Sequence, residues 1–116
     1  MNFETKEFTV SEIVVINLPA RVAAETSEEL KKFIKELVER KNYKLVMNLS
    51  QTSFMDSSGL GALVSKIAVT RSNQGDVRLA NPREYIRNLL ELTHLDQIIK
   101  IYPSVKEAVN SFEVKS

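Results

Sequence analysis

The sequence contains no cysteine and only one histidine. The lack of cysteine excludes disulfides, thiolate chemistry and cysteine-based zinc sites, and a single histidine excludes metal sites with several histidine ligands. We therefore expect no bound metal and no cofactor. An excess of charge of one sign is also lacking, because 16 Lys and Arg face 15 Asp and Glu. This balance argues against direct binding of nucleic acid, which needs clustered cations, and against a basic helix on a membrane surface.

Long apolar runs are missing as well. No stretch approaches the roughly 20 apolar residues of a membrane span, and the N-terminal residues lack the basic-then-apolar layout of a signal peptide. The 116 residues correspond to one ordinary domain, and 43% of them are hydrophobic, which is enough for a buried core. These features predict a single domain over residues 1–116 that is soluble, cytoplasmic and not membrane-bound.

Predicted strands and helices alternate along the chain. Aliphatic runs predict strands over residues 13–18, 44–49, 77–80 and 98–102, and a weaker alternation through Phe8 and Val10 predicts an edge strand. Helical spacing predicts four helices, with expected starts at Thr26 (in a capping box with Glu29), Asp56, Asn81 (followed by Pro82) and Ser104 (with Glu107). The second of these helices is expected to end near residues 73–75. Such alternation favours an α/β fold with a mostly parallel sheet, in which function collects at the carboxyl ends of the strands.

The loop after the strand at residues 44–49 leads into the most unusual run of residues. Asp56 is placed to cap the following helix, with Ser57 and Ser58 in its first turn. Gly59 and Gly61 are two of only three glycines in the chain, and each costs a helix about 0.8–1 kcal/mol relative to alanine. Close approach of a neighbouring element or of a partner protein would explain them. A phosphate on Ser57 would lie at the positive end of the helix dipole and keep the fold intact, yet it would spoil docking of acidic or apolar groups.

Residue type alone also allows other interpretations of this run. Aspartate and serine are favoured capping residues, so a plain helix start accounts for them without any function. A serine hydrolase with Ser57 as nucleophile and His94 as base is disfavoured, because the G-x-S-x-G elbow is absent. A phosphate-cradling loop is excluded, because no G-x-x-x-x-G-K-[ST] run is present.

Residues 48–61, which include Asp-Ser-Ser-Gly-Leu-Gly from Asp56 to Gly61, resemble the signature of the STAS domain of bacterial anti-sigma factor antagonists. Residues 90–96 and 101–109 are similar to the C-terminal half of that family, and residues 26–30 to the start of its first helix. The resemblance covers nearly the whole chain. It implies the STAS fold, a mostly parallel β-sheet with an antiparallel N-terminal edge strand and about four helices.

The resemblance also implies a regulatory protein rather than an enzyme. In the family, the unphosphorylated antagonist binds an anti-sigma factor that is also a serine kinase, and this frees a sigma factor. The kinase phosphorylates the serine after the motif aspartate, here Ser57, and a PPM-type serine phosphatase reverses the step. The implied partner-binding residues are Asp56, Ser57, Ser58, Gly59, Leu60, Gly61, Ala23 and Ala24. Such a protein can act as a monomer or a weak dimer, and the alternative is a STAS interaction module without phosphoregulation in a signalling or transport assembly.

One loop departs from the family pattern. The family usually has Gly-x-Leu/Ile-Asp before the first helix, whereas this chain has Ala20 and Ala23 at the glycine and aspartate positions. Alanine carries no charge and accepts no side-chain hydrogen bond, so the departure bears on partner choice and on phosphorylation of Ser57. Most charged residues of the first predicted helix, including Lys31, Lys32 and Lys35, indicate a solvated face. Four other cations are candidates for holding an acidic partner near the loops, namely Lys66, Arg71, Arg83 and Arg87.

Overall fold

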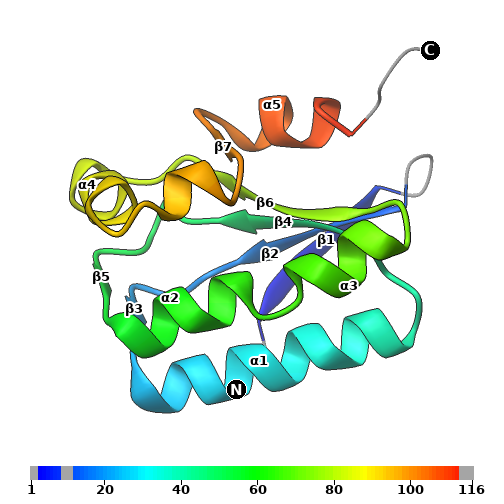
Figure 1. Ribbon diagram of the computed structural model, residues 1–116, viewed down its shortest axis with the longest axis horizontal. Coiled ribbons are helices and arrows are strands. Elements are labelled where there is room, and N and C mark those ends of the chain that lie inside the picture. The colour runs from blue at the N-terminus through cyan, green and yellow to red at the C-terminus, as the bar shows by residue number, and fades with distance from the viewer. Residues whose placement is uncertain (1–2, 9–11, 113–116) are drawn as a thin grey trace.

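The computed structural model describes residues 3–8 and 12–112. Its main sheet has five strands in the order β1-β2-β4-β6-β7 (Figure 1). These strands are β1 (Glu4–Phe8), β2 (Ile13–Asn17), β4 (Lys44–Asn48), β6 (Asp76–Ala80) and β7 (Ile101–Tyr102). The edge strand β1 runs antiparallel to β2, and all the other pairs are parallel. The α/β architecture with an antiparallel N-terminal edge strand is confirmed, although Val10 lies outside the described residues.

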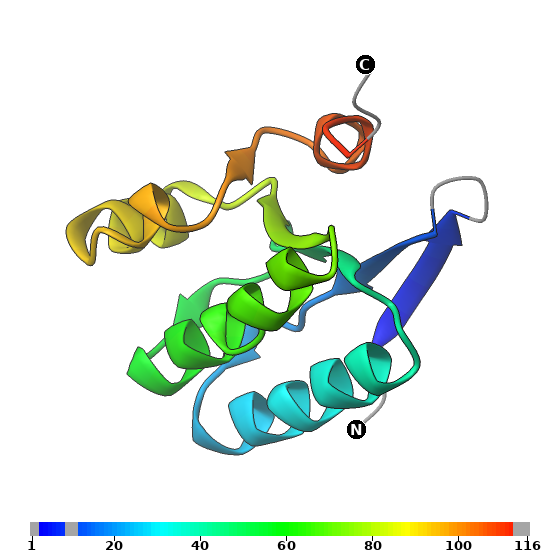
Figure 2. The same cartoon turned by 45° about the vertical axis from the view of Figure 1, so that its right-hand side comes forward.

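Helices cover both faces of this sheet. Figures 1 and 2 show α1 (Ala24–Glu39), α2 (Ser57–Val64) and α3 (Ile67–Ser72) on one face and α5 (Val105–Asn110) on the other. The helix α4 (Glu84–Leu92) and the 3-10 turn η1 (Leu95–Gln97) lie beyond the carboxyl end of β6. The larger core lies under α1–α3 and includes Ile16, Leu30 and Leu79, each fully buried, while the smaller one joins Val46 to Val109 of α5. Burial on both faces is what the continuous aliphatic runs predict.

The helix α1 begins before the predicted capping box. Its first residue is Ala24 and its N-cap is Ala23, which makes no side-chain capping bond, so the predicted start at Thr26 is wrong. The backbone N–H of Ser27 donates to the carbonyl of Ala23 at 2.7 Å, and the Ser27 hydroxyl donates to the carbonyl of Ala24 at 2.9 Å. The chain turns helical this early because Val22, fully buried just before it, anchors the entry to the helix.

The predicted second helix is present as two segments, α2 and α3. The break follows Val64, where the Ser65 hydroxyl donates to the carbonyl of Ala62 at 2.9 Å and the Ser65 N–H donates to the same carbonyl at 3.3 Å. These short-range bonds tighten the last turn of α2 and end it. Asn73 is the C-cap of α3, which confirms the predicted end of the second helix near residues 73–75.

Two further predictions near the C-terminal half are wrong. The helix α4 begins at Glu84 with Arg83 as its N-cap, because Asn81 has a left-handed φ of 57° and donates its N–H to the carbonyl of Tyr102 at 2.8 Å. Asn81 therefore continues the pairing toward β7 and does not cap a helix. The strand predicted over residues 98–102 is limited to β7, since Ile98 is 50% exposed and follows η1. The predicted start at Ser104 is confirmed, because its hydroxyl accepts the N–H of Glu107 at 3.1 Å.

Candidate functional site

Two short strands that the sequence analysis did not anticipate build the site. The strands β3 (Arg21–Val22) and β5 (Phe54–Met55) pair in parallel as a separate two-stranded sheet. The N–H of Ser53 extends this pairing by donating to the carbonyl of Ala20 at 2.8 Å. The loop before α1 and the loop before α2 are thereby held side by side at the carboxyl end of the main sheet, on the left of Figure 1.

Polar residues, one buried and two partly buried, hold these loops at the ends of β2 and β4. The hydroxyl of Thr52, a fully buried residue, donates to the carbonyl of Pro19 at 2.9 Å. The side-chain amides of Asn17 and Asn48 are joined by a hydrogen bond of 2.7 Å. None of these three residues was predicted from the sequence. The sequence does contain one signal for the two asparagines, since each comes near the end of a predicted strand. In the structure, Asn17 and Asn48 are paired in register on neighbouring parallel strands.

Asp56 caps α2, as predicted. One carboxylate oxygen, Oδ1, accepts the backbone N–H of Ser58 at 3.0 Å, that of Gly59 at 3.1 Å and the Ser58 hydroxyl at 2.6 Å. The Ser58 hydroxyl and then the Gly59 N–H lower the pKa of Asp56 below its ordinary value, because both bonds favour the ionised carboxylate. Asp56 is therefore a fixed negative charge at neutral pH, directly before Ser57.

The two serines after Asp56 differ in their availability. Ser58 is partly buried, and its hydroxyl is committed to Asp56. Ser57 is exposed, and its hydroxyl forms no hydrogen bond with any residue that the structure describes, His94 included. His94 follows α4 in the sequence. It is the N-cap of η1, and its backbone is in the left-handed conformation. The described residues therefore hold no nucleophile–base pair at Ser57.

The two glycines of α2 have different surroundings. Gly59 is buried, and a Cβ added to it would lie 2.5 Å from the carbonyl oxygen of Val22 and 2.6 Å from Met55 Cγ. A neighbouring element of the same chain therefore explains Gly59. Gly61 is exposed, and an added Cβ would have no neighbour within 4 Å among residues 3–8 and 12–112. Nothing inside the described chain requires a glycine at that position.

The other predicted partner-binding residues lie in two places, in the core beneath α2 and at the start of α1. Leu60 is only 8% exposed and belongs to the main core, so it supports the helix from beneath. Ala24 is exposed and Ala23 partly exposed, at the start of α1. Their loop is joined to the Ser57 loop, since the N–H of Asp56 donates to the carbonyl of Val22 at 3.4 Å.

The four candidate cations do not all lie near the loops. Arg83 does, because its Nε donates to the carbonyl of Ser50 at 2.9 Å. Arg71 lies at the opposite end of the sheet, where its Nε is 2.9 Å from Asp76 at the start of β6. It is therefore unsuited to a partner at Ser57. A cation outside the predicted set lies on the two-stranded sheet of β3 and β5, since the Arg21 guanidinium stacks 4.3 Å above the ring centre of Phe54.

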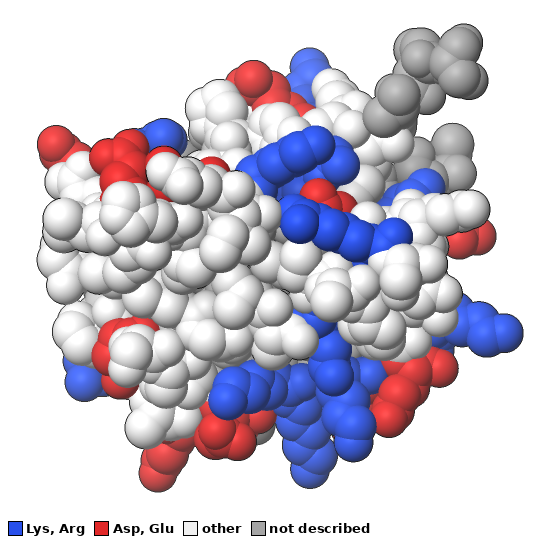
Figure 3. All heavy atoms as spheres, in the orientation of Figure 1, with Lys and Arg blue, Asp and Glu red and all other residues white. Residues whose placement is uncertain are grey.

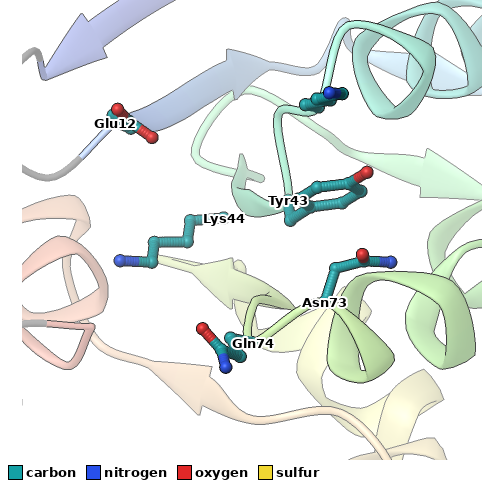
Figure 4. Close-up of a pocket in the computed structure, with 6 residues that line it drawn as sticks. Glu12, Tyr43, Lys44, Asn73 and Gln74 are labelled. Atoms are coloured by element: carbon teal, nitrogen blue, oxygen red, sulfur yellow. The ribbon is translucent and has the colours of Figure 1, made fainter.

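The amino end of the sheet holds a separate hollow of about 210 Å³. Its lining residues are Glu12, Lys41, Tyr43, Lys44, Asn73 and Gln74. Figure 4 shows that Tyr43 and Lys44 point in opposite directions, so the side chains do not converge on one ligand position. Lys41 and Gln74 have left-handed φ values of 68° and 66° because each follows the C-cap of a helix. Helix termination explains the backbone of this hollow.

The sequence pattern of the STAS domain matches residues 6–108. The chain belongs to the STAS domain family. Among curated proteins, a candidate anti-sigma factor antagonist of Thermotoga maritima is 30% identical over 107 residues, covering 91% of this chain and 95% of its own. The anti-sigma F factor antagonist of Paenibacillus polymyxa is 25% identical over 105 residues, covering 90% of each chain.

Solved structures agree with the fold of this STAS domain. The crystal structure of a candidate anti-sigma factor antagonist from Thermotoga maritima has a TM-score of 0.86 at 28% identity, covering 97% of this chain and 95% of that one. The anti-sigma factor antagonist SpoIIAA in its unphosphorylated form has a TM-score of 0.75 at 22% identity, covering 98% and 100%, which supports the fold alone. STAS anti-sigma factor antagonists are regulatory proteins without enzymatic activity, so the hydrolase hypothesis is not retained. Within the described residues, no helix is long and apolar enough to cross a membrane.

Proposed function

We propose that this protein is an anti-sigma factor antagonist controlled by phosphorylation of Ser57. In its unphosphorylated form it binds an anti-sigma factor serine kinase, and phosphorylation by that kinase ends the complex. A PPM-type serine phosphatase restores the binding form. The observation that carries the proposal is the exposed Ser57 hydroxyl, which has no hydrogen-bond partner among the described residues and stands beside the ionised Asp56.

The surroundings of Ser57 support a switch in binding rather than in folding. Asp56 already accepts the N–H groups of Ser58 and Gly59, so the start of α2 does not depend on the Ser57 side chain. A phosphate there would add about −1.5 to −2 charges next to an existing carboxylate. One turn further along α2, the bare backbone at Gly61 leaves room for close approach of a partner. The added charge would repel acidic groups of that partner. Burying it against apolar groups of the partner would cost desolvation free energy.

The test uses the anti-sigma factor kinases encoded in the source genome, purified and mixed with this protein and ATP. Mass spectrometry is expected to locate one phosphate on Ser57 in the wild type and in Ser58→Ala, and none in Ser57→Ala. Calorimetric titration is expected to show that Ser57→Asp binds the kinase at least tenfold more weakly than Ser57→Ala. Equal binding by the two variants, both with wild-type circular dichroism, would overturn the switch.

A second candidate function is a STAS interaction module without phosphoregulation. It is favoured by Ala23, the N-cap of α1, which presents no carboxylate where the family usually has an aspartate. The same experiment separates the two functions. Tight binding to the kinase with no phosphate on Ser57 supports the unregulated module, whereas phosphate on Ser57 with loss of binding supports the switch.

A further inference from the structure

Lysines line a hollow on the surface beside α2, away from the Ser57 loop. It has a volume of about 300 Å³ and lies where α1 passes the junction of α2 and α3. Its lining residues, called here the lysine groove, are Glu28, Lys31, Lys32, Lys35, Ser65 and Lys66. Figure 3 shows basic side chains gathered over α1 and this junction, in the lower part of the view.

The groove concentrates positive charge in a nearly neutral protein. Four lysines and one glutamate leave it with three excess positive charges, although the whole chain carries only +1. Two of the lysines pair along α1, Lys31 with Glu28 at 3.5 Å and Lys35 with Glu39 at 3.8 Å. These pairs are exposed, so carboxylates of another molecule can replace them at little cost. Lys32 and Lys66 form no ion pair with any part of the chain that the structure describes.

The helix break after α2 assembles the groove from two elements. α2 ends at Val64, and Ser65, its C-cap, lines the hollow with a short side chain. Lys66, the N-cap of α3, then lines it opposite the lysines of α1. The lysines of α1 are therefore more than a solvated helix face, because a fourth lysine from a different helix joins them around one hollow.

The groove continues the face of α2 that begins at Ser57. Ser57, Gly61 and Ser65 are all exposed, and their spacing of four residues places them on one side of the helix. At 1.5 Å per residue, Ser65 lies about 12 Å along the axis from Ser57. Figures 1 and 2 show α1 and α2 side by side. A protein that docks at Ser57 and follows α2 therefore reaches the lysine groove.

We propose that the lysine groove binds an acidic segment of the protein that docks at Ser57. Lysine ammonium groups are point charges on flexible stems, which suit several carboxylates spread along a chain better than one planar anion held by a rigid fork. Lys32 and Lys35 are exposed and Lys31 and Lys66 partly exposed, so their main role is to capture the partner by raising the association rate at low salt. The identity of the partner rests on the proposed function, whereas the affinity for an acidic chain rests on the groove alone.

The test is a titration of the full-length, ¹⁵N-labelled protein with a fluorescein-labelled peptide containing six consecutive glutamates. A peptide with six glutamines is the control ligand. The groove variant is Lys31→Gln/Lys66→Gln, and its charge-matched control is Lys100→Gln/Lys106→Gln, whose lysines are exposed elsewhere on the surface. NMR shifts locate the bound peptide, fluorescence anisotropy gives the affinity, and the series is repeated at high salt and with inorganic tripolyphosphate.

The proposal expects shifts at residues 28–35 and 65–66, caused by the glutamate peptide only and weakened by salt. The groove variant is expected to lose roughly five- to tenfold in affinity, and the control variant less than twofold. Shifts elsewhere, equal losses in both variants, or tripolyphosphate binding the groove more tightly than the peptide would each overturn it. Ser57→Asp keeps all four lysines, so unchanged peptide binding by that variant separates this proposal from the Ser57 switch.

Discussion

Two helices start next to each other at the carboxyl end of the sheet, and their N-caps are built in opposite ways. Asp56 begins α2 with a carboxylate that accepts two backbone N–H groups, whereas Ala23 begins α1 with no side-chain bond. Both N-caps have an extended backbone, so both could hold a capping side chain. The difference shows that side-chain capping is confined to the start that carries Ser57, whereas α1 has its acidic residue, Glu25, within its first turn.

The contact between the two starts depends on a residue without a side chain. The carbonyl of Val22, just before Ala23, accepts the N–H of Asp56 and lies against the α-carbon of Gly59. The capped helix is therefore positioned by the loop of the uncapped one. Changes at the contact are expected to affect both helices, while changes at either N-cap affect one.

The largest expected effect is that of Gly59→Ala, compared with Gly61→Ala. The new Cβ at position 59 meets a backbone carbonyl at 2.5 Å, which cannot rotate away, so we expect a loss of about 1–3 kcal/mol in the free energy of unfolding. At position 61 the Cβ meets no atom of the described residues within 4 Å, and helix propensity alone predicts a gain of about 0.8–1 kcal/mol. Urea denaturation measures both, and equal effects at the two positions would show that the contact with Val22 is unimportant.

Exchanging the N-caps has the next largest effect. Ala23→Asp is expected to stabilise the protein by about 0.5–2 kcal/mol, since its extended backbone suits a carboxylate that caps α1. Asp56→Ala removes three hydrogen bonds from α2 and is expected to lower the melting temperature. Ala23→Asn separates the capping bond from the charge, because asparagine caps as well as aspartate. If neither Ala23 variant is more stable than the wild type, a capping side chain at position 23 does not stabilise α1.

Acid pH gives a second test of the Asp56 cap. The pKa of Asp56 is lowered in the folded protein, so its ionised form contributes stability above the ordinary value of 3.8, and this contribution is lost as the pH falls below that value. The difference in melting temperature between wild type and Asp56→Asn is therefore expected to stay constant from neutral pH to about pH 5 and to shrink in more acidic buffers. A constant difference down to the lowest pH at which both proteins fold would contradict the lowered pKa.

The same two starts show what could be predicted from the sequence. Asp56 was predictable because a capping aspartate precedes a serine pair and a clear apolar stripe. Thr26 and Glu29 matched a capping box equally well, yet α1 begins at Ala24 because the burial of Val22 fixes the chain earlier. Local patterns cannot show which buried residue anchors a loop, and that information decides where the helix begins.

The site depends on contacts between residues that lie far apart in the sequence and close together in space. The strands β3 and β5 have two residues each, too few for any periodicity to appear, although their pairing brings the two loops together. The sequence indicated that two glycines within a predicted helix, Gly59 and Gly61, required a structural explanation. Only the structure separates them, because the contact of Gly59 is with Val22, 37 positions earlier in the printed chain.

The smallest expected effect compares the two serines as contributors to stability. Ser58→Ala removes the hydroxyl that donates to Asp56 at 2.6 Å, and we expect a loss of about 0.5–1 kcal/mol. Ser57→Ala removes a hydroxyl without a partner among the described residues, so its free energy of unfolding is expected to stay within about 0.5 kcal/mol of the wild type. Chemical denaturation in the absence of any partner measures both variants. A larger loss for Ser57→Ala would mean that its hydroxyl helps to hold the fold, and a serine that holds the fold is poorly suited to a switch that must leave the fold intact.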